Sequence, residues 1–115
     1  MNYHGSCHCG DVRFAFEGEF GPALACNCSI CQRKGSLLWF MPREALRLET
    51  PDTPLSAYTF NSHRIAHQFC PRCGIHPFAW AQDPSGKEMA AVNIRCLEDI
   101  DLDAIEVKHY DGRAR

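Results

Sequence analysis

The segment Cys70-Pro71-Arg72-Cys73-Gly74 has the form of a zinc knuckle, a turn that aims two thiols at one metal ion. A tighter pair, Cys7-His8-Cys9, lies near the N-terminus and is followed by Gly10. A glycine after each pair permits a positive φ and lets backbone amides approach the thiolates. We expect the two pairs to combine into one closed four-thiolate zinc site, formed by Cys7, Cys9, Cys70 and Cys73.

Such a site would join the N-terminal segment to the centre of a small protein. The chain has 115 residues and a mass of 13.0 kDa, which is the size of one domain, so we expect a single zinc-binding domain over residues 1–115. A core of this size is modest, and a structural metal would compensate for it. Metal binding would then be part of the folding free energy.

A second group of cysteines occupies Cys26-Asn27-Cys28-Ser29-Ile30-Cys31. Three protein ligands leave one position of a tetrahedral zinc free for substrate, which is the arrangement of catalytic zinc sites. Three thiolates make the ion electron-rich, so hydrolysis is less favoured than capture of an exogenous thiol. The sequence therefore predicts a second zinc on Cys26, Cys28 and Cys31, these three residues as part of the catalytic site, and two zinc ions per chain.

Other assignments of the eight cysteines are open at this point. Cys28 and Cys31 could pair with Cys70 and Cys73, leaving Cys7, Cys9 and Cys26. Cys96 is either a small buried residue or a fourth ligand that closes the second site. A closed second site would favour the alternative function, a non-catalytic zinc module for protein interaction or for metal or redox sensing. A disulfide framework is disfavoured because no signal peptide is evident.

Alternating apolar and polar residues dominate the chain and predict a mostly β fold. The expected strands are 11–17, 36–41, 55–60, 65–69, 75–81, 87–94 and 105–110, with a turn at Asn61-Ser62-His63. Pro77 should place its strand at a sheet edge or bulge. Short helical turns are expected at 29–34 and 97–104. Together these elements predict a mostly antiparallel domain of about seven strands.

Charge and hydropathy exclude several classes of partner. The net charge is −2 with a pI near 6.3, which argues against binding of nucleic acid through general basicity. The longest apolar run, 37–41, is too short to span a bilayer, so no membrane association is expected. Eight cysteines without a secretory signal indicate a reducing compartment, and we expect a cytoplasmic protein.

Histidines and basic residues near the cysteine groups are further candidates. On a strand, His63 and His67 would share one face, and His67 could act as the general acid or base. His76 could support the knuckle or simply pack, whereas His8 should point away from the metal. Arg33 and Lys34 follow the three-cysteine group and could bind a substrate carboxylate or lower a thiol pKa.

The three cysteine motifs, in this order, resemble the glutathione-dependent formaldehyde-activating enzyme family, a zinc domain also described as centromere-protein-V-like. Weaker matches are Val92-Asn93-Ile94-Arg95-Cys96-Leu97-Glu98 and residues 107–113. The resemblance implies a β-tent, in which small antiparallel sheets are clamped by a structural zinc on Cys7, Cys9, Cys70 and Cys73. It implies a second zinc on Cys26, Cys28 and Cys31 beside the glutathione site. It further implies a carbon–sulfur lyase that condenses glutathione with formaldehyde to S-hydroxymethylglutathione.

Overall fold

The computed structural model describes residues 2–18, 21–60 and 65–112. These residues form ten strands in two sheets and little helix, which confirms the mostly β prediction. The strands are β1 (Asn2–Ser6), β2 (Arg13–Glu17), β3 (Ala23–Cys26), β4 (Leu38–Pro42), β5 (Arg47–Leu48), β6 (Ser56–Tyr58), β7 (Ala66–Phe69), β8 (Phe78–Gln82), β9 (Glu88–Asn93) and β10 (Val107–Tyr110). The helices are α1 (Ser29–Lys34) and the 3-10 turns η1 (Arg43–Ala45), η2 (Ile94–Cys96) and η3 (Leu102–Ala104).

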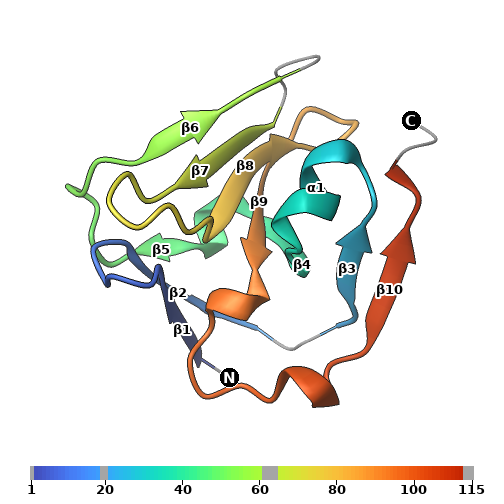
Figure 1. The fold of residues 1–115 in the computed structure, drawn as a ribbon, viewed down its shortest axis with the longest axis horizontal. Helices are drawn as coiled ribbons and strands as arrows, with labels where there is room; N and C mark the ends of the chain where they lie inside the picture. Colours follow the sequence, from blue (N-terminus) through green and yellow to red (C-terminus); the bar gives the residue numbers. More distant parts are fainter. Residues whose placement is uncertain (1, 19–20, 61–64, 113–115) are drawn as a thin grey trace.

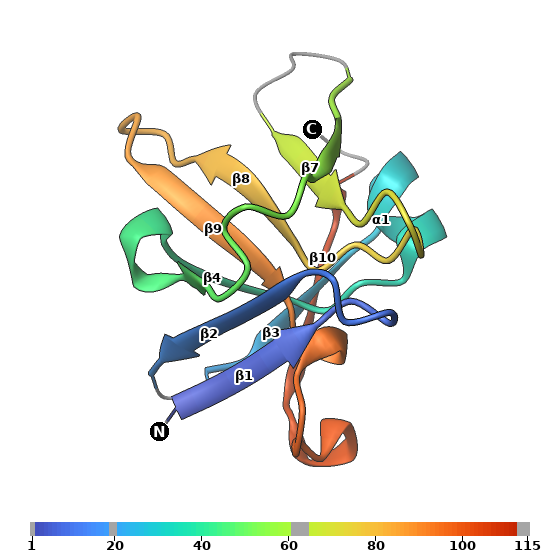
Figure 2. The same ribbon diagram turned by 90° about the vertical axis from the view of Figure 1, so that its left-hand side faces the viewer.

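The two sheets differ in size and direction. The smaller sheet has the strand order β1-β2-β5, and the larger has the order β10-β3-β4-β9-β8-β7-β6. Their strands run at a steep angle to one another (Figure 2). Neighbouring strands are antiparallel except β10 and β3, which run side by side in the same direction (Figure 1). None of the helices in the described residues is long and apolar enough to cross a membrane.

The main core lies on the face of the larger sheet that meets the smaller one. Phe14 and Phe16 of β2 are fully buried there, together with Phe78 of β8 and Val92 of β9. Phe14 and Phe78 pack edge to face with ring centroids 5.7 Å apart. Because successive residues of a strand point to opposite faces, the neighbours of these core residues point to the other side of the large sheet.

The other face of the large sheet carries small side chains in its middle. The register aligns His67 of β7 with Ala79 of β8, Ala79 with Ala91 of β9, and Ala91 with Phe40 of β4. These four residues therefore form a row across one face, with two alanines in its middle. Helix α1 covers this face and contributes Cys31 to a small apolar cluster with Leu38 and the two alanines. The short alanine side chains leave room beneath the helix.

Most expected elements are present with shifted ends. Strands occur within all seven expected ranges or within one residue of them, and the helical turn at 29–34 is helix α1. Only Leu102–Ala104 of the expected helical turn at 97–104 is helical. The turn at Asn61-Ser62-His63 lies outside the described residues, although β6 and β7 do pair as an antiparallel hairpin.

Two features differ from the expectation. The prediction for Pro77 is wrong, because β8 begins after it at Phe78 and lies between β7 and β9 rather than at an edge. Pro77 has no N–H to donate, but it lies just before the paired residues of β8. Its carbonyl oxygen still accepts a hydrogen bond from the amide of Asn93 at 2.9 Å. The short strands β1, β3 and β5 were not predicted, because their sequences show no clear alternation.

Candidate functional site

Four cysteines from two distant loops meet at the first candidate metal site. Cys7 and Cys9 follow β1, and Cys70 and Cys73 follow β7. Their four Sγ atoms all lie within 4.8 Å of one another. The Cys7–Cys9 and Cys9–Cys70 sulfur separations are both 3.6 Å. The four-thiol cluster expected from the sequence is therefore assembled by the fold.

The sulfur spacing fits a tetrahedral zinc ion. With Zn–S bonds of about 2.3 Å, the sulfur atoms of a tetrahedron are about 3.8 Å apart, close to the observed separations. Backbone amides also point at the sulfur atoms, as in a knuckle. Val12 N lies 3.3 Å from Cys7 Sγ, and Arg72 N lies 3.4 Å from Cys70 Sγ. The glycines after each pair, Gly10 and Gly74, have φ of 86° and 80°, which makes both turns possible.

The second candidate metal site contains the three cysteines at the start of helix α1. Cys26 ends β3, Cys28 precedes the helix, and Cys31 lies in its first turn. Their three Sγ atoms lie within 4.8 Å of one another, and the amide of Cys28 donates to Cys26 Sγ at 3.4 Å. Among the described residues, no histidine or carboxylate joins this group of three. The donor set therefore fits a zinc ion with one position left for another ligand.

The pKa values of this group differ strongly. Burial raises the pKa of Cys31 to about 12, and hydrogen bonding to Cys28 adds to the increase. Partial burial also raises the pKa of Cys28, but hydrogen bonds from Cys31 and Cys26 outweigh it and lower the net value. Lys34 lies in the field of all three thiols, and its charge lowers the pKa of Cys31. The Cys28 thiol therefore ionises more readily than the Cys31 thiol.

A cavity of about 180 Å³ opens beside the three cysteines. Its lining includes Cys26, Cys28 and Cys31, together with the row that includes His67. The rest of its lining is mostly apolar: Leu24, Ile30, Leu38, Phe40, Phe60, Ile65, Ala79, Ala81, Ala91 and Tyr110. Few polar side chains reach this space, so each of them is a candidate for chemistry.

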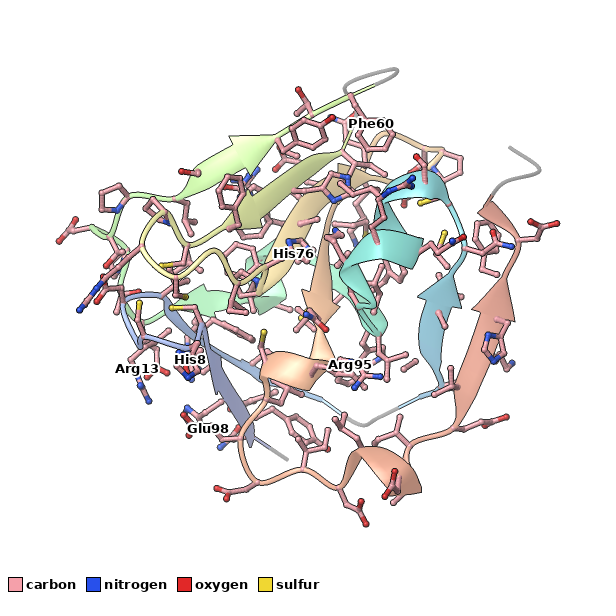
Figure 3. The ribbon with its side chains drawn as sticks, viewed as in Figure 1. His8, Arg13, Phe60, His76, Arg95 and Glu98 are labelled. Carbon is pink, nitrogen blue, oxygen red and sulfur yellow. The ribbon has the colours of Figure 1, made fainter. Side chains whose placement is uncertain are left out.

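Three of these polar side chains, Lys34, His67 and His76, lie together. Lys34 Nζ is 2.9 Å from His67 Nδ1, and the rings of His67 and His76 have centroids 5.9 Å apart. His76 Nδ1 is 2.7 Å from the carbonyl oxygen of Gln68. Burial, followed by the charge of Lys34, lowers the pKa of both histidines to about 4, so both rings are neutral near pH 7. Figure 3 shows His76 near the middle of the molecule.

The placement of several sequence candidates is now clear. Cys70 and Cys73 group with Cys7 and Cys9, so the alternative pairing with Cys28 and Cys31 is wrong. Cys96 does not close the second site, because its thiol lies 3.7 Å from the carbonyl oxygen of His76 and in the field of Cys7 and Cys73.

None of the three remaining candidates, His8, His63 and Arg33, is among the described residues that line the cavity. His8 is exposed, as expected, and His63 lies outside the described residues. Arg33 is exposed and lines a shallow hollow with Ser29, Ile30, Tyr58 and Phe60, which adjoins the cavity at Ile30 and Phe60.

One residue near the second site was not found from the sequence. A Cβ on Gly112 would lie 2.5 Å from Cys26 Sγ and 3.0 Å from Cys28 Cβ. The segment that ends at Gly112 is held there by β10 and by Asn27, whose amide nitrogen donates to the carbonyl oxygen of Tyr110 at 3.1 Å. The side chain of Asn27 adds a bond to Asp111 Oδ1 at 3.0 Å. Only the absence of a side chain allows this segment to pack against the cysteines.

Two comparisons with known proteins agree with this architecture. A crystal structure of a Rhodobacter sphaeroides protein is 33% identical in sequence and superimposes with a TM-score of 0.80, covering 93% of this chain and 99% of that one. Residues 2–110 match the family described as "Glutathione-dependent formaldehyde-activating enzyme", and this range contains all eight cysteines. The chain therefore belongs to the glutathione-dependent formaldehyde-activating enzyme family.

Proposed function

We propose that the protein is a zinc-dependent carbon–sulfur lyase or synthase that joins a thiol to an aldehyde, with glutathione and formaldehyde as the substrates that the family description suggests. The observation that carries the proposal is the placement of three clustered thiols and a buried histidine in the lining of one cavity. The first cysteine group, none of whose residues lines this cavity, would hold a purely structural zinc.

The second cysteine group would bind the thiol substrate through a zinc ion. A zinc ion held by Cys26, Cys28 and Cys31 would offer its fourth position to an incoming thiol and favour loss of the thiol proton. Burial lowers the pKa of Lys34, but the nearby thiolates oppose this shift, so the charged Lys34 and the thiolates favour one another. The apolar walls exclude water, so the thiolate is weakly solvated and nucleophilic.

His67 supplies the proton that the carbonyl oxygen needs. In the reaction, the thiol sulfur forms a bond to the aldehyde carbon, the carbonyl π electrons move to oxygen, and oxygen gains a proton. Because an ammonium group only donates, Lys34 donates to Nδ1 of His67, and the hydrogen bond assigns the ring proton to Nε2. His67 can deliver that proton from Nε2 while Nδ1 receives another from Lys34, and the proton that the thiol released to solvent then returns this pair to the Nε2–H ring and the charged amine. The reverse sequence cleaves the adduct.

A tripeptide such as glutathione is too large for the cavity alone. The adjoining hollow with Arg33 lies where the peptide part of a bound thiol would emerge. The Arg33 guanidinium is exposed and donates to the Ser29 carbonyl at 2.7 Å, so it is held in place and can also bind a carboxylate. We assign Arg33 to recognition of the thiol and not to the chemical step.

Exchange NMR spectroscopy tests this function directly. With the zinc-loaded protein, the rate of interconversion between formaldehyde hydrate plus glutathione and their adduct should exceed the spontaneous rate. Cys28→Ser should abolish the acceleration and lose one of two zinc equivalents. Cys96→Ser is the matched control, because its thiol belongs to neither cysteine group, and it should retain both zinc and rate. A fully zinc-loaded protein that gives only the spontaneous rate would refute the proposal.

A further inference from the structure

Two buried nitrogen atoms in the cavity have no partner among the described residues. They are Nε2 of His67 and Nε2 of His76, and their side chains are 7% and 9% exposed. An unpaired buried polar atom costs free energy, so a pair of them in one cavity indicates that a ligand completes the hydrogen bonding. The cavity lining contains both residues.

The hydrogen bonds at the two Nδ1 atoms make one Nε2 atom a hydrogen-bond donor and the other an acceptor. Lys34 donates to Nδ1 of His67, so Nε2 of this neutral ring carries the proton and is a donor. Nδ1 of His76 must donate to the carbonyl oxygen of Gln68, since a carbonyl only accepts. Nε2 of the neutral His76 ring is therefore an acceptor. One donor and one acceptor thus face the same space.

A hydroxyl group, of water in the free protein or of a bound ligand, satisfies both atoms at once. Its oxygen accepts from His67, and its hydrogen is donated to His76. A carbonyl oxygen can only accept, so it would pair with His67 and leave Nε2 of His76 unpaired. The free-energy cost of that unpaired buried atom exceeds the gain from the hydrogen bond to His67. The hydroxyl-bearing adduct therefore fits this pair better than the free aldehyde.

We propose that His67 and His76 form a hydroxyl-binding site that recognises the alcohol group of a thiol–aldehyde adduct, with His76 as the residue that distinguishes the adduct from the free aldehyde. This inference rests on the proposed function for the identity of the ligand, but its hydrogen-bond pattern belongs to the protein itself. His76 is a positioning residue for the hydroxyl, and Lys34 acts through His67 by fixing its tautomer.

The ring tautomers give the first test, which needs no ligand. Long-range proton–nitrogen correlation spectra of the zinc-loaded protein near pH 7 should show the Nε2–H form for His67 and the Nδ1–H form for His76. The Nε2–H form at His76 would overturn the proposal, because no acceptor would then face the cavity.

Binding of two nearly isosteric thioethers gives the second test. Titration calorimetry should show that S-(2-hydroxyethyl)glutathione binds more tightly than S-propylglutathione, by about tenfold or more, the effect expected when a buried pair is satisfied. His76→Asn keeps a donor for the Gln68 carbonyl but has no acceptor at the position of Nε2, so it should abolish the preference. His76→Gln restores an acceptor near the position of Nε2 and should recover part of it.

The thioether experiment has one control variant, and each binding outcome either supports or contradicts the hydroxyl site. His8→Asn removes an exposed histidine that does not line the cavity, and this variant should bind both thioethers as the unmodified protein does. Equal affinity for both thioethers in the unmodified protein would overturn the hydroxyl site, even if the rate acceleration were present. A clear preference without any rate acceleration would instead support the hydroxyl site and refute the proposed reaction. Binding of neither thioether would overturn the hydroxyl site.

Discussion

Cys9 Sγ lies 3.6 Å from Cys70 Sγ, although the two cysteines are 61 positions apart in the chain. This contact joins the loop after β1 to the loop after β7, and so connects the small sheet to the large one. A zinc ion at this point would act on the whole fold, whereas one at Cys26, Cys28 and Cys31 would act on a single helix and its neighbours. The two cysteine groups should therefore respond differently to substitution.

Cys70→Ser should largely unfold the protein. Structural zinc contributes about 10 kcal/mol or more to the folding of small domains, which is similar to the total stability of such a domain. Cys28→Ser should leave the fold intact, because its group is not part of the connection between sheets. Thermal unfolding followed by circular dichroism, together with zinc content, measures both effects. Equal loss of structure in the two variants would contradict the division into a structural and a functional site.

Ala79→Val should reduce the cavity and weaken substrate binding. Ala79 lies in the middle of the row beneath α1, and its small side chain contributes to the open space. Two added methyl groups fill part of this space, so KM should increase severalfold while the melting temperature changes little. Ala57→Val on β6 is the control, because Ala57 is exposed and does not line the cavity. An unchanged KM for Ala79→Val would show that the substrate binds elsewhere.

Lys34→Met should raise the pKa of His67 above about 4. Burial is the main cause of that low pKa and would remain, but the charge of Lys34 also lowers it and would be gone. Loss of the cation makes protonation of the ring less costly, so the pKa moves upward. The rate of adduct formation should fall as well. NMR titration of the ring measures the pKa, and Lys108→Met on the exposed face of β10 serves as the control. An unaltered pKa would mean that burial alone sets it.

Gly112→Ala should disturb the second metal site without affecting the first. The new Cβ would meet Cys26 Sγ at 2.5 Å and Cys28 Cβ at 3.0 Å, so the segment or the cysteines must move. Zinc content should fall from two equivalents towards one, with the overall fold retained. Gly21→Ala is the matched control, since a Cβ there has open space and should leave both metals in place. Retention of two tightly bound zinc ions in Gly112→Ala would argue against this contact.

The metal-binding pattern was predictable from the sequence because cysteine spacing carries the chemistry directly. Cys7, Cys9, Cys70 and Cys73 group as expected, and so do Cys26, Cys28 and Cys31. The strands with clear alternation were predictable for a similar reason. Strand β1, with the sequence NYHGS, was not, because its role depends on pairing with β2 and not on its own hydrophobicity.

The polar lining of the cavity was only partly predictable. His67 was a candidate from its distance to Cys70 along a strand, but its burial depends on Phe60 and on His76, whose rings lie within 6 Å of it. His76 precedes β8, and no periodic pattern predicts the direction of its ring. Gly112 and the parallel pairing of β10 with β3 depend on contacts between distant segments, which local sequence patterns do not report.

The parallel pairing of β10 with β3 has a consequence for the order in which the protein matures during synthesis. Cys7, Cys9, Cys70 and Cys73 are all synthesised before residues 107–112, so the ligands of the first site precede strand β10. The wall of the functional site formed by Tyr110 and Gly112 is added only later. The second site is thus completed only when residues 107–112 have been made, whereas all the ligands of the first site are present before them.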